Sequence, residues 1–236
     1  MKNVLLTTDF SDNSKNAMNY AINMFGLKDV NYVVLNSYED ISASSGALVS
    51  LVDTLRNDSI LRLKEVEEEL NSSYDGIKVE TRSIFGSVTR SINHLSKEMV
   101  FDYLIIGIKG LSVLEKLIMG SNTLDVIKSI KIPLLVIPTD CEYKGLHRIA
   151  FAADYEKLND SQVLDPMVNV AKLTGAEVKI VNVSEKEEGA DVPHALEGFV
   201  LHGMLEGLEH QYFTEVNDKV TDGLEAFIKE NNIDVM

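Results

Sequence analysis

The sequence is poor in cysteine, tryptophan and positive charge. Among its 236 residues Cys141 is the single cysteine, which excludes an intramolecular disulfide and any site built from several thiolates. Only 22 Lys and Arg residues stand against 37 Asp and Glu residues, a formal net charge of −15. This balance argues against a nucleic-acid partner and against an anionic membrane surface, because both require clustered basic side chains.

Long hydrophobic runs are also missing. No apolar stretch approaches the roughly 20 residues of a membrane-spanning helix. The first short apolar run ends at the acidic Asp9, so no signal peptide is readable. We therefore expect a cytoplasmic protein, with which the lone cysteine agrees.

Short β-branched runs alternate with longer amphipathic segments along the first 140 residues. The runs predict buried strands because they are nearly continuous in apolar residues. Apolar residues at helical spacing predict the helices between them. The expected strands are 4–8, 32–36, 78–85, 103–106 and 133–138, and the expected helices are 11–25, 48–70, 88–99 and 122–130.

This alternation predicts an α/β fold with an open, mostly parallel five-stranded sheet covered on both faces. Right-handed crossovers limit the topology to a doubly wound sheet of strand order 3-2-1-4-5. In such a sheet the ligand crevice lies beyond the carboxyl ends of the strands, where the direction of winding switches.

The pattern then repeats after a linker over residues 139–146. The segment Lys2–Phe10 corresponds to His147–Tyr155, which places Asp154 at the position of Asp9. Strand two recurs one residue later in the alignment, and Asn36 then falls on Asn182. Further along, a strand is expected over 212–216, a helix over 222–229 and the opening of a fourth strand over 232–236. The sequence thus predicts two domains, 1–140 and 147–236, the second a truncated copy without a counterpart to residues 105–138.

One segment with spaced glycines suggests a ligand-binding site. It reads Gly107-Ile108-Lys109-Gly110, then nine residues, then Gly120-Ser121-Asn122-Thr123. Gly107 ends a strand, where a backbone without a side chain can turn and approach a ligand. The Gly120-Ser121 pair precedes a helix, whose free N–H groups and dipole favour an anion. A polyphosphate could be held between the glycine loops by backbone N–H groups and the hydroxyls of Ser121 and Thr123, although helix capping alone also explains Gly-Ser. The P-loop and dinucleotide fingerprints are absent.

Together, a first strand ending in Asp9, the G-x2-G-x9-G-S spacing, the Pro-flanked last strand and the strand–helix order resemble the universal stress protein family. The resemblance covers residues 1–140 fully and 147–236 as a weaker repeat, as in tandem universal stress proteins. It implies the adenine nucleotide alpha hydrolase-like fold and a stress-response or regulatory role. It also implies ATP as the ligand, with or without Mg²⁺, bound by the first repeat only.

The resemblance also implies where the nucleotide would lie. Asp9 would contact the ribose or adenine end, and Gly107 and Gly110 would line the nucleotide. The phosphates would be held by Gly120, Ser121, Asn122 and Thr123. The strand-two contact falls near Asn36 and Ser37, which makes the base pocket more polar than the aliphatic residue common in relatives. Lys109 would pair with a phosphate or remain solvated. The second copy keeps Asp154 but lacks the glycines, so no nucleotide is expected there.

Alternative functions stay open at this point. The rival to an ATP-binding regulator, which could at most hydrolyse ATP slowly, is an assembly module that binds no nucleotide and acts through protein contacts. A true phosphotransferase or hydrolase is the third class. No catalytic residues are assigned. His194, His202 and His210 are too dispersed to predict a metal site. The edge strand Leu134–Ile137 predicts a homodimer, because its unpaired backbone groups can pair with a second copy, and the resembled family commonly uses this edge.

Overall fold

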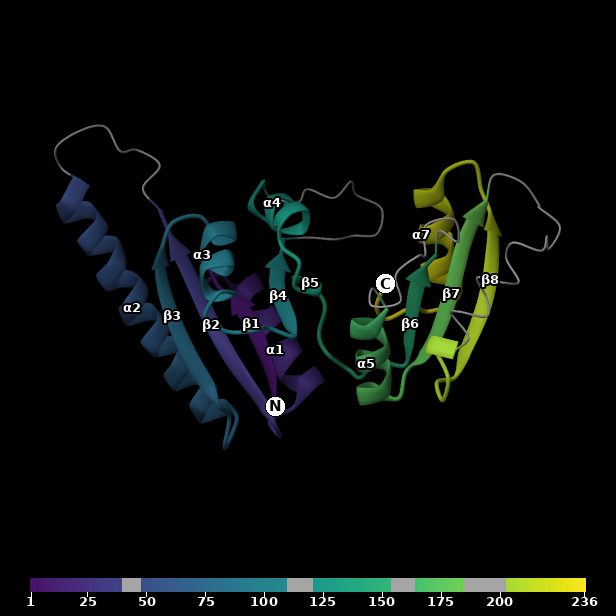
Figure 1. Ribbon diagram of the computed structural model, residues 1–236, viewed down its shortest axis with the longest axis horizontal. Coiled ribbons are helices and arrows are strands. Elements are labelled where there is room, and N and C mark those ends of the chain that lie inside the picture. The colour runs from purple at the N-terminus through teal and green to yellow at the C-terminus, as the bar shows by residue number, and fades with distance from the viewer. Residues whose placement is uncertain (40–47, 110–120, 154–163, 185–202) are drawn as a thin grey trace. The chain divides into compact units, whose positions relative to one another are not determined.

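The computed structural model describes residues 1–39, 48–109, 121–153, 164–184 and 203–236, with the backbone alone at 48–50, 121 and 122. The chain divides into two compact units, Met1–Tyr143 and Lys144–Met236 (Figure 1). Each unit contains its own parallel sheet. Among the described residues, no helix combines the length and apolar character needed to cross a membrane.

The first unit is a five-stranded parallel sheet with helices on both faces. Its elements are β1 (Lys2–Thr7), α1 (Asp12–Phe25), β2 (Val30–Tyr38), α2 (Leu48–Ser73), β3 (Val79–Phe85), α3 (Val88–Leu95), β4 (Tyr103–Ile108), α4 (Ser121–Ser129) and β5 (Leu134–Pro138). The strand order is β3-β2-β1-β4-β5. This confirms the predicted doubly wound α/β sheet and its order.

Polar side chains set where the helices of the first unit begin. Ser11 caps α1 by accepting a hydrogen bond from the Ser14 amide, and Ser87 caps α3 in the same way. The predicted helix over 88–99 is too long, since α3 ends at Leu95. Beyond that residue the backbone tightens into a turn, in which the Lys97 amide donates to the His94 carbonyl.

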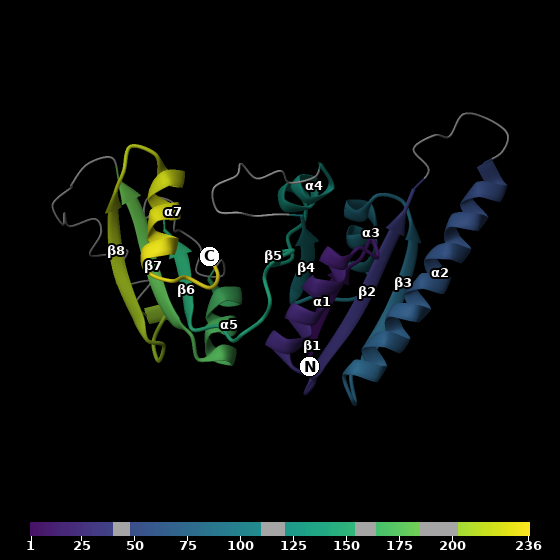
Figure 2. The same ribbon diagram turned by 180° about the vertical axis from the view of Figure 1, so that it is seen from behind.

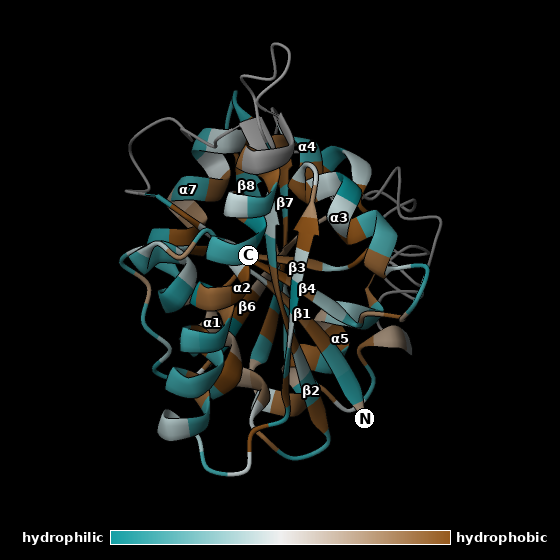
Figure 3. Cartoon of the chain, turned by 90° about the vertical axis from the view of Figure 1, so that its left-hand side faces the viewer, coloured by the Kyte–Doolittle hydropathy of each residue, from teal (hydrophilic) through white to brown (hydrophobic). Residues whose placement is uncertain are grey.

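The core lies on both faces of the sheet. Helices α3 and α4 cover one face (Figure 1), and α1 and α2 cover the other (Figure 2). Leu5 of β1 and Leu104 of β4 are fully buried on the α3 and α4 side, where they join Ile92 and Val126. Apolar residues therefore concentrate on the strands and on the helix faces turned toward them (Figure 3).

The second unit repeats part of this arrangement. Its described elements are β6 (Arg148–Ala152), α5 (Asp165–Thr174), β7 (Glu177–Ser184), β8 (His210–Val216) and α7 (Val220–Glu230). The strands form a parallel sheet of order β6-β7-β8. The predicted opening of a fourth strand is present as a single parallel bridge between Ile149 and Val235.

Matching contacts show that the two units share one design. The bridge Ile149–Val235 repeats the pairing of Val4 with Tyr103 between β1 and β4. Beside each pair, an aspartate carboxylate accepts a hydrogen bond from a first-strand amide. Asp102 accepts from Asn3 at 2.7 Å, and Asp234 accepts from Arg148 at 2.9 Å. The two units thus share these contacts of the first strand.

Candidate functional site

The strand order of the first unit reverses between β1 and β4, and the turn after β1 lies at the carboxyl edge of the sheet there. In this turn Oδ1 of Asp9 accepts hydrogen bonds from the Ser11 hydroxyl and, at 3.0 Å, from the Ser11 amide. Partial burial acts to raise the pKa of Asp9, but the hydrogen bonds from Ser11 and Ser14 outweigh it and hold the pKa below its ordinary value. Asp9 is therefore an exposed, ionised carboxylate in a fixed position.

Phe10 gives this turn an unusual backbone. Its φ is 65°, in the left-handed region that a bulky residue rarely adopts. Such a conformation costs about 1–3 kcal/mol and persists only where the surroundings impose it. The Phe10 amide donates to Oγ1 of Thr8 at 2.9 Å, and the guanidinium of Arg62 lies 4.1 Å from the centre of the Phe10 ring.

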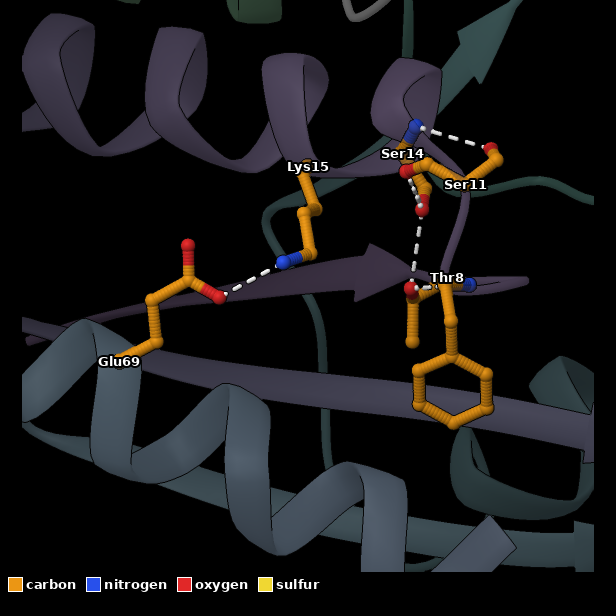
Figure 4. A network of polar contacts seen from close by, with 6 residues as sticks. Thr8, Ser11, Ser14, Lys15 and Glu69 are labelled. Carbon is orange, nitrogen blue, oxygen red and sulfur yellow. Dashed lines mark hydrogen bonds and ion pairs between the residues drawn. The ribbon is translucent and has the colours of Figure 1, made fainter.

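A network of hydroxyl groups joins the turn to the start of α1 (Figure 4). The hydroxyls of Thr8 and Ser14 lie 2.9 Å apart, and Ser14 also donates to the Ser11 carbonyl at 2.8 Å. The residue after Ser14, Lys15, forms an ion pair with Glu69 of α2 at 2.8 Å. The Asp9 turn, defined here as residues 8–11, is thus tied to both α1 and α2.

Asn36 lies beneath the turn and is bonded within the fold. Its Nδ2 donates to the Thr8 carbonyl at 2.8 Å, and its Oδ1 accepts from the Ser59 hydroxyl at 2.7 Å. Ser59 also lies 2.7 Å from the hydroxyl of Ser83. The residue expected to make the base pocket polar therefore uses its amide to hold β1, β2 and α2 together, and the same amide-to-carbonyl bond joins Asn182 to Ala153 in the second unit.

Gly107, near the end of β4, serves packing. A Cβ atom on this residue would lie 2.4 Å from the backbone oxygen of Asn13, a distance that real Cβ contacts do not reach. The first turn of α1 can approach β4 only because residue 107 has no side chain. We expected the missing side chain of residue 107 to make room for a ligand. Packing within the fold also explains why this residue is a glycine.

The end of β5 is fastened to the same turn of α1. The hydroxyl of Thr139 lies 2.6 Å from Oδ1 of Asn13 and 3.0 Å from the carbonyl of Ile108. Asn16 donates to the carbonyls of Pro138 and Cys141. Hydrogen bonds therefore join the ends of β4 and β5 to the start of α1 beside the Asp9 turn.

The other predicted site residues are described to different extents. Ser37 is half-buried near the end of β2, Lys109 is exposed directly after β4, and Thr123 is half-buried in the first turn of α4. Ser121 and Asn122 begin α4. Gly110, Gly120 and Asp154 lie outside the described residues. The structure thus places Asp9, Ser37, Gly107 and Lys109 at or near the carboxyl ends of β1, β2 and β4.

Residues that the sequence did not single out also shape this edge. Phe10, Ser59 and Arg62 were given no role, since their contacts join residues far apart in the chain and leave no local pattern. The described residues contain no group of three or more His, Cys, Asp or Glu side chains able to hold a metal ion. His194 and His202 lie outside the described residues.

Comparison with known proteins adds three findings. The sequence model described as "Universal stress protein family" matches residues 1–138. A curated Staphylococcus aureus protein named as a universal stress protein is 28% identical over 147 residues, which are 59% of this chain and 85% of that protein. The structure of a universal stress protein from Archaeoglobus fulgidus is 22% identical, covers 98% of this chain and 84% of that one, and has a TM-score of 0.75.

Another solved universal stress protein is in complex with cAMP. It is 20% identical, covers 59% of this chain and 98% of that one, and has a TM-score of 0.44. The Archaeoglobus structure shows that the fold of nearly the whole chain occurs in another protein.

Proposed function

Because the chain belongs to the universal stress protein family, we propose that its first unit binds ATP at the carboxyl edge of the sheet and that the bound nucleotide regulates the protein. The observation that carries this proposal is the position of the Asp9 turn. It lies at the point where the strand order reverses, beside β4, and the glycine motif begins at Gly107 near the end of β4. Doubly wound sheets bind their ligands at this point.

The residues of this edge supply complementary groups for such a ligand. The Asp9 carboxylate is a hydrogen-bond acceptor suited to ribose hydroxyls or to the amino group of adenine. The backbone after β4 and the start of α4 offer N–H groups to the phosphates. Ser121, Asn122 and Thr123 add polar side chains to the N-terminal turn of α4, and Lys109 adds a positive charge. Gly110 and Gly120 would let the backbone approach the phosphates, with or without Mg²⁺.

In this proposal the protein is a cytoplasmic regulator and not an enzyme. Nucleotide binding would stabilise one conformation or assembly, because a ligand that binds the folded state shifts its population. The nucleotide is expected in the first unit, where the glycine motif lies.

The rival function is an assembly module that binds no nucleotide. The observation in its favour is Gly107, since the packing of α1 explains this glycine without a ligand. One simple measurement distinguishes the two functions. Thermal unfolding with and without Mg-ATP should show a higher midpoint with nucleotide if the first function holds, and no change if the rival holds.

Two further measurements complete the test. Nucleotide that remains on the purified protein can be released by denaturation and identified by chromatography, and ATP is the expected species. Incubation with ATP should produce little ADP, while turnover at ordinary enzyme rates would overturn the assignment as a binding protein. Absence of both copurified nucleotide and calorimetric binding would leave the assembly module as the function.

A further inference from the structure

Helix α2 reaches the Asp9 turn through two side chains that lie three residues apart. Arg62 contacts Phe10 of the turn from the surface, and Ser59 acts from inside the fold through Asn36, which donates to the Thr8 carbonyl. Residues three apart lie on the same side of a helix, so a single stripe of α2 faces the turn. Glu69, seven residues beyond Arg62, pairs with Lys15 of α1 and continues this stripe.

The inner contact passes through Asn36. The Ser59 hydroxyl donates to Oδ1 of Asn36 at 2.7 Å, and Nδ2 of Asn36 donates to the carbonyl of Thr8 at 2.8 Å. Both side chains are nearly inaccessible, since Ser59 is 2% exposed and Asn36 is 6% exposed. The carbonyl that receives this bond belongs to the residue directly before Asp9. Loss of the Ser59 hydroxyl would leave the buried Oδ1 without this donor, which is costly.

The outer contact acts on the strained residue of the turn. The guanidinium of Arg62 lies 4.1 Å from the centre of the Phe10 ring, a favourable cation–π distance. Phe10 has a φ of 65°, so its backbone requires contacts that keep it there. The Phe10 ring extends from the same turn whose carboxylate is Asp9.

We propose that Ser59 and Arg62 are positioning residues that hold the Asp9 turn in the geometry needed for its ligand. Neither side chain needs to touch the ligand. This inference rests on the proposed function for the identity of the ligand, which is ATP. The contacts themselves can be tested without nucleotide.

The first experiment measures amide hydrogen exchange of the ligand-free full chain. The reporters are the Phe10 amide, which donates to Thr8, and the Ser11 amide, which donates to Asp9. Arg62→Met removes the charge and keeps a long side chain, and Arg56→Met is its matched control on the exposed surface of α2. Ser59→Ala breaks the inner contact. Its control, Ser83→Ala, removes a neighbouring hydroxyl and leaves the Ser59–Asn36–Thr8 contact intact.

Exchange at both reporters should rise about threefold in Arg62→Met and about tenfold in Ser59→Ala. It should stay within about twofold of the wild type in the two controls. Arg62→Lys retains a cation and should restore slow exchange, which a purely steric role of the side chain would not predict. Unchanged exchange in Arg62→Met and in Ser59→Ala would overturn the inference. Because Arg62 is on the surface, its variant decides the matter even if Ser59→Ala does not fold.

The second experiment measures Mg-ATP affinity of the same variants by calorimetry. The dissociation constant should rise by the same factors, about threefold and about tenfold, in the two test variants. Faster exchange with unchanged affinity would show that the contacts do not serve the ligand and would overturn the positioning role. A wild-type chain that binds no ATP would instead refute the proposed function, while the exchange data would still decide whether Ser59 and Arg62 hold the turn.

Discussion

A Cβ atom on Gly107 would lie 2.4 Å from the backbone oxygen of Asn13 and 2.8 Å from its carbonyl carbon. The first glycine of the motif is therefore required by the approach of α1 to β4, whatever the ligand. A glycine in a nucleotide-binding pattern can serve the fold and the ligand at once, and these two roles predict different effects of substitution.

The structural role of Gly107 predicts a loss of stability. Gly107→Ala should lower the free energy of unfolding of the first unit by about 2 kcal/mol or more, because the added methyl group overlaps backbone atoms that cannot rotate away. Denaturant titration provides the measurement. Gly203→Ala is the control, since a Cβ at Gly203 would meet nothing within 4 Å. Equal stability of Gly107→Ala and the wild type would contradict the close packing.

Most of the fold could be predicted from the sequence because buried parallel strands and amphipathic helices leave strong periodic signals. The five strands, their order and the repeat of Asn36 at Asn182 follow from such patterns. The ends of helices were harder to predict from the sequence, because local turns set them. The helix expected to reach residue 99 ends at Leu95, beyond which the amides of Lys97 and Glu98 donate to carbonyls only three residues back.

The candidate site was predictable only in outline. Asp9 is recognisable because it follows a buried strand, but the contact of Phe10 with Arg62 joins residues 10 and 62, which share no sequence pattern. The hydrogen bonds of Asn36 could not be predicted for a similar reason. Asn36 lies near the end of β2, while Ser59, which donates to it, lies on α2, 23 residues further along the chain.

The ligand role of the glycine motif is tested at Gly120. Gly120→Val should weaken ATP binding at least about tenfold, or about 1.4 kcal/mol, because a branched side chain would obstruct the phosphates and disfavour a positive φ. Calorimetry measures the affinity, and the fold should survive. Asp154→Ala, in the second unit and outside the glycine motif, should bind ATP as the wild type does. Unchanged affinity of Gly120→Val would remove the motif from the site.

The lowered pKa of Asp9 predicts a stability change in acid. Its folded pKa lies below the ordinary value of 3.8, so the ionised group stabilises the fold above about pH 4. This contribution is lost as the pH falls through the folded pKa. Ser11→Ala removes a hydroxyl that donates to Asp9 and should therefore raise the pKa of Asp9, as followed by NMR titration. The Ser11→Ala substitution should also lower the free energy of unfolding by about 1 kcal/mol, since Ser11 caps α1. An unchanged pKa in this variant would contradict the hydrogen bond.

Asp102 and Asp234, which hold equivalent places in the two units, predict effects confined to their own units. Asp234→Ala removes the carboxylate that accepts from the amides of His147 and Arg148. The second unit should lose about 1–2 kcal/mol of stability. The first unit, in which Asp102 accepts the equivalent hydrogen bond from Asn3, should be unaffected. Hydrogen exchange of amides in β1 and β6 separates the two effects. Equal exchange in β6 of variant and wild type would show that the carboxylate contributes nothing.

The edge position of β5 among the described strands predicts a homodimer. This strand ends the sheet order of the first unit, and its residues Leu134–Ile137 are apolar. The Thr139 amide donates inward to the Ile108 carbonyl, so by alternation the Val136 amide points outward, away from β4. An apolar edge with free N–H and C=O groups favours pairing with another strand, and a second copy about a two-fold axis offers an identical one.

Two substitutions at residue 136 separate backbone pairing from side-chain packing. Val136 packs against the core beneath α3 and α4, so Val136→Ala and Val136→Pro both remove apolar contacts. Only Val136→Pro also removes the outward N–H group, and an edge strand tolerates proline at such a position. Light scattering should therefore find Val136→Ala dimeric and Val136→Pro shifted toward monomer. A wild-type chain that stays monomeric at high concentration, or a dimeric Val136→Pro variant, would show that this edge does not pair two copies.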